Sequence, residues 1–129
     1  YYLDRLKDMD IDEAKKKRFE GEARFILALR YYRMTRHFGD IPLIKEKPID
    51  LDEAALPRSP KQEVLDYALA NVNKAIDYLP ETYTNDNIGR ITKGAALTCT
   101  WIWQVMLNFI KDRMQPSFGK KLLLPQNKL

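Results

Sequence analysis

Apolar residues recur at helical spacing from about residue 12 to residue 38, and this pattern predicts one long helix. Asp10 or Asp12 can cap its first turn. Gly39 and Pro42 end it, because glycine adopts the positive φ found at helix ends and proline cannot continue a helix. One apolar face is formed by Phe19, Ala23, Ile26, Leu27, Tyr31, Met34 and Phe38. A second face is formed by Phe25, Ala28, Leu29 and Tyr32, so we expect neighbours packed on both sides.

A second amphipathic helix is predicted to end at Leu79, before Pro80. Residues 41–57 contain three prolines and no sustained period, which is typical of an extended connector. Ser59, Pro60 and Gln62 then form a capping-box pattern at the start of the helix. One stripe of this helix is apolar and consists of Val64, Leu65, Ala68, Leu69, Val72, Ala75, Ile76 and Leu79.

A third helix is predicted from Thr92, as its cap, to about Arg113. The residues before it, 82–89, include the turn-forming stretch TNDNIG. Helices of about 20 residues joined in sequence favour antiparallel neighbours, and no segment shows the alternation of a strand. The fold class is therefore all-α, built from antiparallel helical hairpins.

Composition narrows the class of protein but not its function. The 129 residues are 45% apolar and 31% charged, which suits one globular domain or a piece of one. The net charge of +4 comes from 22 basic and 18 acidic residues that are interleaved, so a mixed surface is favoured over a polyanion-binding face. Cys99 and His37 are the only residues of their types, which excludes an internal disulfide and a Cys/His zinc site.

No apolar stretch approaches the roughly 18 residues that a membrane-spanning helix needs. The sequence opens at Tyr1 without a basic and then apolar leader, so we expect that an export signal was either removed or never present.

Catalytic chemistry finds little support in the sequence. His37 and Asp40 could form a base and its orienting partner, but no Ser or Cys nucleophile lies near them, and a histidine at a helix end usually solvates that end. The run KKKR at 15–18 could touch nucleic acid or anionic lipid, yet four consecutive residues point around the whole helix. Asp50, Asp52 and Glu53 lack the spacing of a calcium loop. We predict no enzyme activity, no metal and no cofactor.

One group of side chains has the chemistry of a sugar site, in which rings stack on aromatic faces and amides bond hydroxyls. It consists of Tyr31, Tyr32, Tyr83, Asn85, Asp86 and Asn87. The alternative is that the first two tyrosines belong to the core and that residues 85–87 are only a loop. Cys99 is interpreted as a small apolar residue of a helix.

Three phrases occur together in an informative order: GEARFILALRYYRMTRHFGDIPLI at 21–44, RSPKQEVLDYALANVNKAIDYLP at 58–80, and GRITKGAA at 89–96. Together they resemble the N-terminal helical part of SusD/RagB-like nutrient-binding lipoproteins. The resemblance covers about residues 12–96. The residues that match the family pattern are Arg36, Gly39, Asp40, Pro42, Gly89, Arg90, Thr92 and Lys93. We interpret all of them as architectural.

The resemblance implies a tetratricopeptide-like scaffold at the surface of a Bacteroidota-type outer membrane. There it would sit on a SusC-like TonB-dependent transporter and capture a glycan or peptide, without catalysis. Leu27 departs from the family, which usually has Arg at this place, and the chain carries no lipid-attachment cysteine near its start. The ligand-contacting loops of the family lie mostly outside this segment, so no ligand-binding residue is assigned.

The sequence changes character at Leu97, where the family continues with a helix rich in small residues and this chain has LTCTWIWQVMLNFIKDRMQPSFGKK. A reading frame shifted by one base takes the last base of each codon together with the first two bases of the next codon. Because the codons for each amino acid are limited, the printed sequence restricts which alternative peptide this frame could encode from Thr98 onward. That peptide contains a forced Asp and a forced Ala and resembles the family's third helix better. We therefore hypothesise two segments: 1–96, which is SusD-like, and 97–129, which follows a one-base frameshift and ends early at Leu129.

A different class of function stays open from the sequence alone. A free-standing tetratricopeptide-type adaptor could bind peptide in a groove near Tyr31 and Tyr32. A basic nucleic-acid binder ranks last because the acidic residues are interleaved with the basic ones.

Overall fold

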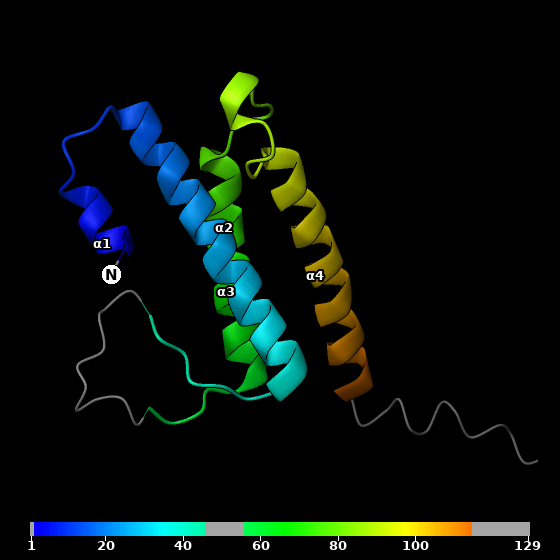
Figure 1. Cartoon of the computed structure of the whole chain (residues 1–129). Coiled ribbons are helices and arrows are strands. Elements are labelled where there is room, and N and C mark those ends of the chain that lie inside the picture. Colours follow the sequence, from blue (N-terminus) through cyan, green and yellow to red (C-terminus); the bar gives the residue numbers. More distant parts are fainter. Residues whose placement is uncertain (1, 46–55, 115–129) are drawn as a thin grey trace, which may run out of the picture.

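The computed structural model describes residues 2–45 and 56–114, and every helix among them belongs to a single layered bundle (Figure 1). The elements are α1 (Tyr2–Lys7), α2 (Glu13–Phe38), α3 (Lys61–Tyr78), the 3₁₀ turn η2 (Asn85–Asn87) and α4 (Lys93–Met114). Figure 1 shows α3 running antiparallel to α2, with α4 beside the pair and α1 on the opposite side of α2. The all-α prediction of antiparallel hairpins is confirmed for the described residues.

Helix α2 begins and ends as its sequence predicts. The Asp12 carboxylate accepts a hydrogen bond from the Lys15 amide at 3.3 Å, which satisfies one free N–H of the first turn. At the other end, Gly39 has φ of 71° and ψ of −120°, and its amide donates to the Thr35 carbonyl at 3.0 Å. This backbone conformation is accessible to glycine and strained for other residues, so Gly39 fixes the exit of the chain.

The hairpin of α2 and α3 forms the main core. Val64, Ala68, Val72 and Ala75 of α3 are fully or almost fully buried, and they pack in one core cluster with Ala28 of α2. The predicted stripe of α3 is confirmed, with only Leu69 and Ile76 of its eight members partly exposed.

Gly21 allows the close approach of the two helices near the start of α2. A Cβ at this position would lie 3.0 Å from the Cβ of Tyr78 and 3.3 Å from Cγ of Leu79. Because such contacts are tighter than nine in ten that real Cβ atoms make, Tyr78 and Leu79 would have to shift by a few tenths of an ångström to admit a side chain here.

Helix α4 packs on the bundle through its inward side. The Trp103 ring stacks on the Tyr32 ring, with centroids 4.6 Å apart and planes 15° apart. Trp103, Leu107 and Ala96 are buried in the same core cluster as α2 and α3. The Thr92 hydroxyl accepts a hydrogen bond from the Ala95 amide at 3.3 Å, so the predicted cap of this helix is confirmed.

The prediction that α2 is packed on both sides is wrong for part of its first face. Ile26, Met34 and Phe38 are 49%, 39% and 74% exposed, although the second face is buried as expected. The reason is that α3 and the Trp103 ring of α4 cover the second face, whereas α1 lies beside only the earlier part of the first face. Helix α1 itself was not anticipated, because six residues carry too little periodicity to predict a helix.

The capping box predicted for α3 is also wrong, because the cap comes from a distant residue. The N-cap residue Pro60 offers no side-chain hydrogen bond. Instead, Oδ1 of Asp40 accepts a hydrogen bond from the Lys61 amide at 2.8 Å. The Ser59 amide donates to the Ile41 carbonyl at 2.9 Å, which makes a single antiparallel bridge, and Gln62 bonds Asp66. The Gly-Asp turn after α2 therefore holds the first turn of α3.

A buried polar pair crosses the same hairpin. Nη1 of Arg24 donates to Oδ1 of Asn71 at 2.9 Å, and Nε of Arg24 donates to Oε1 of Glu20 at 2.8 Å. The Asn71 amide group in turn donates to the Tyr67 carbonyl at 3.0 Å. Buried polar groups are costly unless they are paired, so this pair favours one register of α2 against α3.

Replacement of Asp40 by alanine removes the cap of α3 and is expected to lower the free energy of unfolding by about 1 kcal/mol. Urea denaturation followed by far-UV circular dichroism measures the change. Asp77→Ala is the matched control, because Asp77 is an exposed aspartate of α3 away from its first turn. Equal midpoints for wild type and Asp40→Ala would contradict the cap.

Candidate functional site

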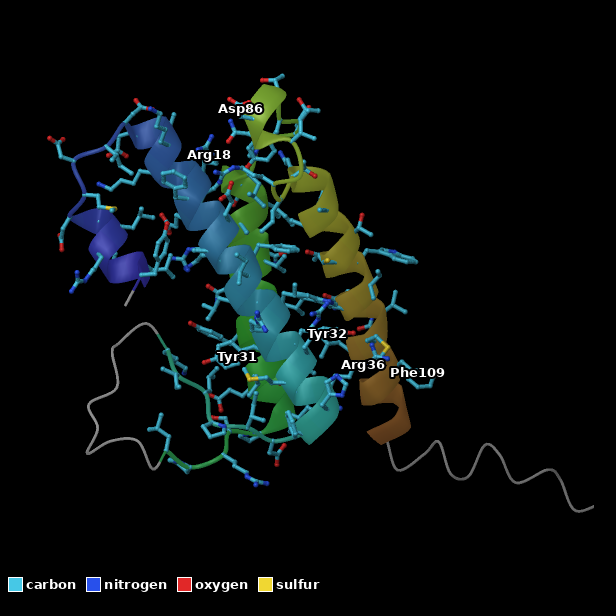
Figure 2. All side chains as sticks on the ribbon, viewed as in Figure 1. Arg18, Tyr31, Tyr32, Arg36, Asp86 and Phe109 are labelled. Carbon is cyan, nitrogen blue, oxygen red and sulfur yellow. The ribbon has the colours of Figure 1, made fainter. Side chains whose placement is uncertain are left out.

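The aromatic residues proposed as a sugar site do not come together in the structure. The Tyr31 hydroxyl donates to the Ile44 carbonyl at 2.8 Å and accepts from the Ile44 amide at 2.9 Å, and burial raises its pKa. Tyr32 is covered by Trp103. Figure 2 shows both tyrosines along the middle of α2 and Asp86 at the far end of the bundle on η2. Tyr31 and Tyr32 therefore serve the core.

Tyr83 takes part in a different cluster, which is centred on Glu22 of α2. The Tyr83 hydroxyl donates to Oε1 of Glu22 at 2.9 Å, and Nη1 of Arg90 donates to Oε2 at 3.0 Å. Nε of Arg18 lies 4.0 Å from Oε1. Because Tyr83 and Arg90 belong to the segment between α3 and α4, Glu22 ties this segment to α2. We call these four residues the Glu22 cluster.

The Glu22 cluster changes the acidity of Tyr83. Burial, and then the hydrogen bond and negative charge of Glu22, raise the pKa of Tyr83 to about 12 from its ordinary value of 10.0. The cations of Arg18 and Arg90 act in the opposite direction and only partly offset this rise. The phenol therefore stays a hydrogen-bond donor over the whole neutral range.

The family-like phrase GRITK builds the entrance to α4. Gly89 has φ of 96°, which favours glycine, and Arg90 beside it reaches Glu22. The Lys93 amide donates to the Pro80 carbonyl at 2.8 Å, which joins the end of α3 to the start of α4. These contacts agree with the architectural interpretation of Gly89, Arg90, Thr92 and Lys93.

The remaining candidates do not form reactive or basic sites among the described residues. Asp40 is engaged at the start of α3, and His37 is exposed with its ring beside that of Phe38. The basic run 15–18 is divided, since Lys16 bonds the Lys7 carbonyl and the Arg18 guanidinium covers the Phe19 ring. No single basic face results.

Cys99 is half-buried on α4, where burial raises the pKa of its thiol, so the thiolate is disfavoured. Asp50, Asp52 and Glu53 lie outside the described residues.

A groove on the outer side of α2 was missed by sequence reasoning, which assigned its residues to a packed face. Its volume is about 430 Å³, and it lies beside α1. Its lining consists of Tyr2, Phe19, Glu22, Ala23, Ile26, Leu27 and Arg30. Helical periodicity of apolar residues reveals such a face, but only the arrangement of α1 shows that it stays open.

The fold and its polar ties define a helical-hairpin scaffold. Residues 1–100 match the family model SusD-like_3, described as "Starch-binding associating with outer membrane". The chain therefore belongs to the SusD-like family, as its resemblance predicted.

Curated relatives support this assignment. The chain is 36% identical over 72 residues to SusD-like protein P2 of Formosa agariphila, a match that covers 55% of this chain and 14% of that protein. It is 30% identical over 86 residues to a SusD-like protein of Bacteroides ovatus, which covers 67% of this chain and 15% of that protein. These matches span only about a seventh of either relative.

Solved structures agree with the fold. A SusD-like protein of Bacteroides fragilis superposes with a TM-score of 0.78 at 29% identity, over 86% of this chain and 22% of that chain. A structure described as a laminarin binding SusD-like protein superposes with a TM-score of 0.72 at 28% identity, over 79% of this chain and 23% of that chain. The described helices thus correspond to a minor part of those proteins.

Neither a membrane-crossing helix nor a clustered metal site is found among residues 2–45 and 56–114. None of the helices in these ranges combines the length and apolar character that crossing a membrane requires. The same residues contain no group of three or more His, Cys, Asp or Glu side chains placed to hold a metal ion.

The raised pKa of Tyr83 makes stability depend on pH in a defined window. Because the folded pKa of about 12 lies above the ordinary value of 10.0, its contribution is complete below pH 10 and is lost as pH rises towards 12. Phenolate absorbance, taken as the difference between wild type and Tyr83→Phe, measures this ionisation.

Glu22→Gln is the informative variant for the same measurement. It removes the carboxylate charge but keeps the burial of Tyr83, so the Tyr83 step is expected at lower pH than in wild type. Far-UV circular dichroism at each pH ensures that folded chains are compared. A wild-type step near pH 10 in the folded chain would contradict the Glu22 cluster.

Proposed function

We propose that this chain is part of the helical scaffold of a cell-surface nutrient-binding lipoprotein, which captures a glycan or peptide for a SusC-like TonB-dependent transporter. The observation that carries the proposal is the family match over residues 1–100. The likeness to a structure described as a laminarin binding SusD-like protein supports a glycan as the ligand. The chain would act by binding, without catalysis.

The described residues suit a scaffold better than a ligand site. The polar groups that the family pattern shares are engaged within the chain: Asp40 on the Lys61 amide and Arg90 on Glu22. Their role is to fix where the connectors leave the helices, from which ligand-facing loops of a whole SusD-like protein would extend. The sites that contact ligand would therefore lie mostly outside these helices.

The adaptor alternative loses the surface that it needs. Tyr31 and Tyr32 are 5% and 9% exposed, so a peptide has no access to them. The nucleic-acid alternative gains nothing from the structure either, because the basic run 15–18 is divided between intramolecular contacts.

The division of the chain into residues 1–96 and residues 97–129 is part of the proposal. We propose that a one-base frameshift replaced the family sequence after about Ala96. Support comes from the family match, which stops at residue 100, and from Trp101, which is 70% exposed. Resequencing of the underlying DNA tests the idea, and an uninterrupted frame without family-like codons in the shifted reading would contradict it.

Co-purification tests the partnership with a transporter. The tagged chain is expressed in its native host, and outer membranes are solubilised and purified on the tag. Recovery of a TonB-dependent transporter by mass spectrometry is expected. A tagged helical protein outside the family, expressed at the same level, is the control. Recovery of the chain from the membrane fraction without any transporter would contradict the proposal.

A further inference from the structure

Three arginines follow one row along the last part of α2. Arg30, Arg33 and Arg36 are spaced three residues apart, so they follow one ridge of the helix over about 9 Å. All three are exposed, and none makes a hydrogen bond or an ion pair with any of residues 2–45 and 56–114. Figure 2 shows Arg36 near the end of α2, on the side of α4. We call these three residues the arginine row.

The positive charge of the arginine row is not neutralised by its neighbours. Residues 23–39 contain no Asp or Glu. On α4, the helix beside the row, residues 94–110 contain no charged side chain. The carboxylates that flank the stretch are engaged, since Glu22 bonds within the Glu22 cluster and Asp40 caps α3. The row is therefore left without a counter-charge on its own helix or on α4.

We propose that the arginine row binds anionic groups, carboxylate or sulfate, of the captured glycan. A guanidinium suits these groups because its fixed fork of N–H donors pairs with two oxygens at once. Successive arginines of the row are about 4.5 Å apart along the helix axis, a step comparable to one sugar ring, so neighbouring substituents of a glycan chain can meet neighbouring arginines. This inference rests on the proposed function and adds to it the charge of the ligand.

The charge of the row also decides between occupants. Long charged side chains are almost never fully buried unless they are paired, so an uncharged layer of further scaffold over the row would bury three guanidiniums at a large cost. The occupant must therefore bring negative charge. A nucleic-acid face is typically larger, since it neutralises on the order of six or more phosphates, whereas the row offers three cations. An anionic glycan fits both the charge and the length of the row.

Isothermal titration calorimetry with dextran sulfate tests the inference on the full 129-residue chain. Uncharged dextran of the same length is the matched ligand. Wild type is expected to bind dextran sulfate and not dextran. The triple variant Arg30→Gln, Arg33→Gln and Arg36→Gln is expected to raise the Kd by about 10-fold or more, because it loses three charge-assisted contacts. Binding of dextran as tight as that of dextran sulfate overturns the inference.

A second triple variant separates the arginine row from net charge. Lys15→Gln, Lys17→Gln and Lys74→Gln removes the same three charges from exposed positions outside the row. Its Kd should stay within about 3-fold of wild type, because only long-range attraction is reduced. Equal weakening in both variants overturns the inference, since net charge alone would then explain binding. Duplex DNA that binds wild type as tightly as dextran sulfate also overturns it.

The inference and the proposed function fail separately. Recovery of a transporter in the co-purification experiment does not depend on the arginine row, so a chain that recovers the transporter but does not bind dextran sulfate overturns only the anionic ligand. Far-UV circular dichroism of both triple variants, whose changed side chains are exposed or lie on the helix surface, ensures that folded chains are compared.

Discussion

The burial of one face of α2 by two helices at once is the constraint on which the structure depends. Ala28 and Thr35 of α2 have no exposed surface. The ring of Tyr32, also on α2, is covered by the stacked Trp103 ring of α4. Helix α3 lies along the same face and fills it with small and β-branched side chains. Helix α4 packs mainly on α3 and meets α2 through the stack of Trp103 on Tyr32, so loss of the α2–α3 hairpin would leave α4 without a site to pack.

Three polar ties then fix the connectors to this hairpin. Asp40 holds the first turn of α3, Tyr31 holds the backbone at Ile44, and Glu22 holds the segment that leads to α4. Each tie joins α2, or the turn that ends it, to a segment distant in sequence. The residues that match the family pattern therefore fix the direction in which the chain leaves the helices. For this reason family membership could be recognised although no ligand-binding residue was assigned.

Sequence periodicity predicted the three long helices to within two residues at their ends, because each carries a clear apolar stripe and a strong start or stop. Periodicity failed to predict the features that depend on contacts between elements distant in sequence. Ser59 had the chemistry of a cap, but Asp40 is brought to α3 by the turn after α2. The first face of α2 was expected to be packed, since a hydrophobic pattern shows which residues can be buried but not which neighbours cover them.

The candidate site was less predictable than the fold. Tyr31, Tyr32 and Tyr83 share a chemistry, yet the first two point into the core and only the third reaches a polar cluster. Asn71 sits among apolar residues of α3, and nothing local indicates that Arg24 would meet it. The groove beside α1 depends on a helix too short to predict.

Native-state hydrogen exchange of α2 tests the central claim most directly. If one face of α2 is held by both α3 and α4, the amides from Ala28 to Thr35 exchange only through global unfolding, with the same free energy of opening as the buried amides of α3. Exchange of these α2 amides by local opening, while α3 stays protected, would contradict the account.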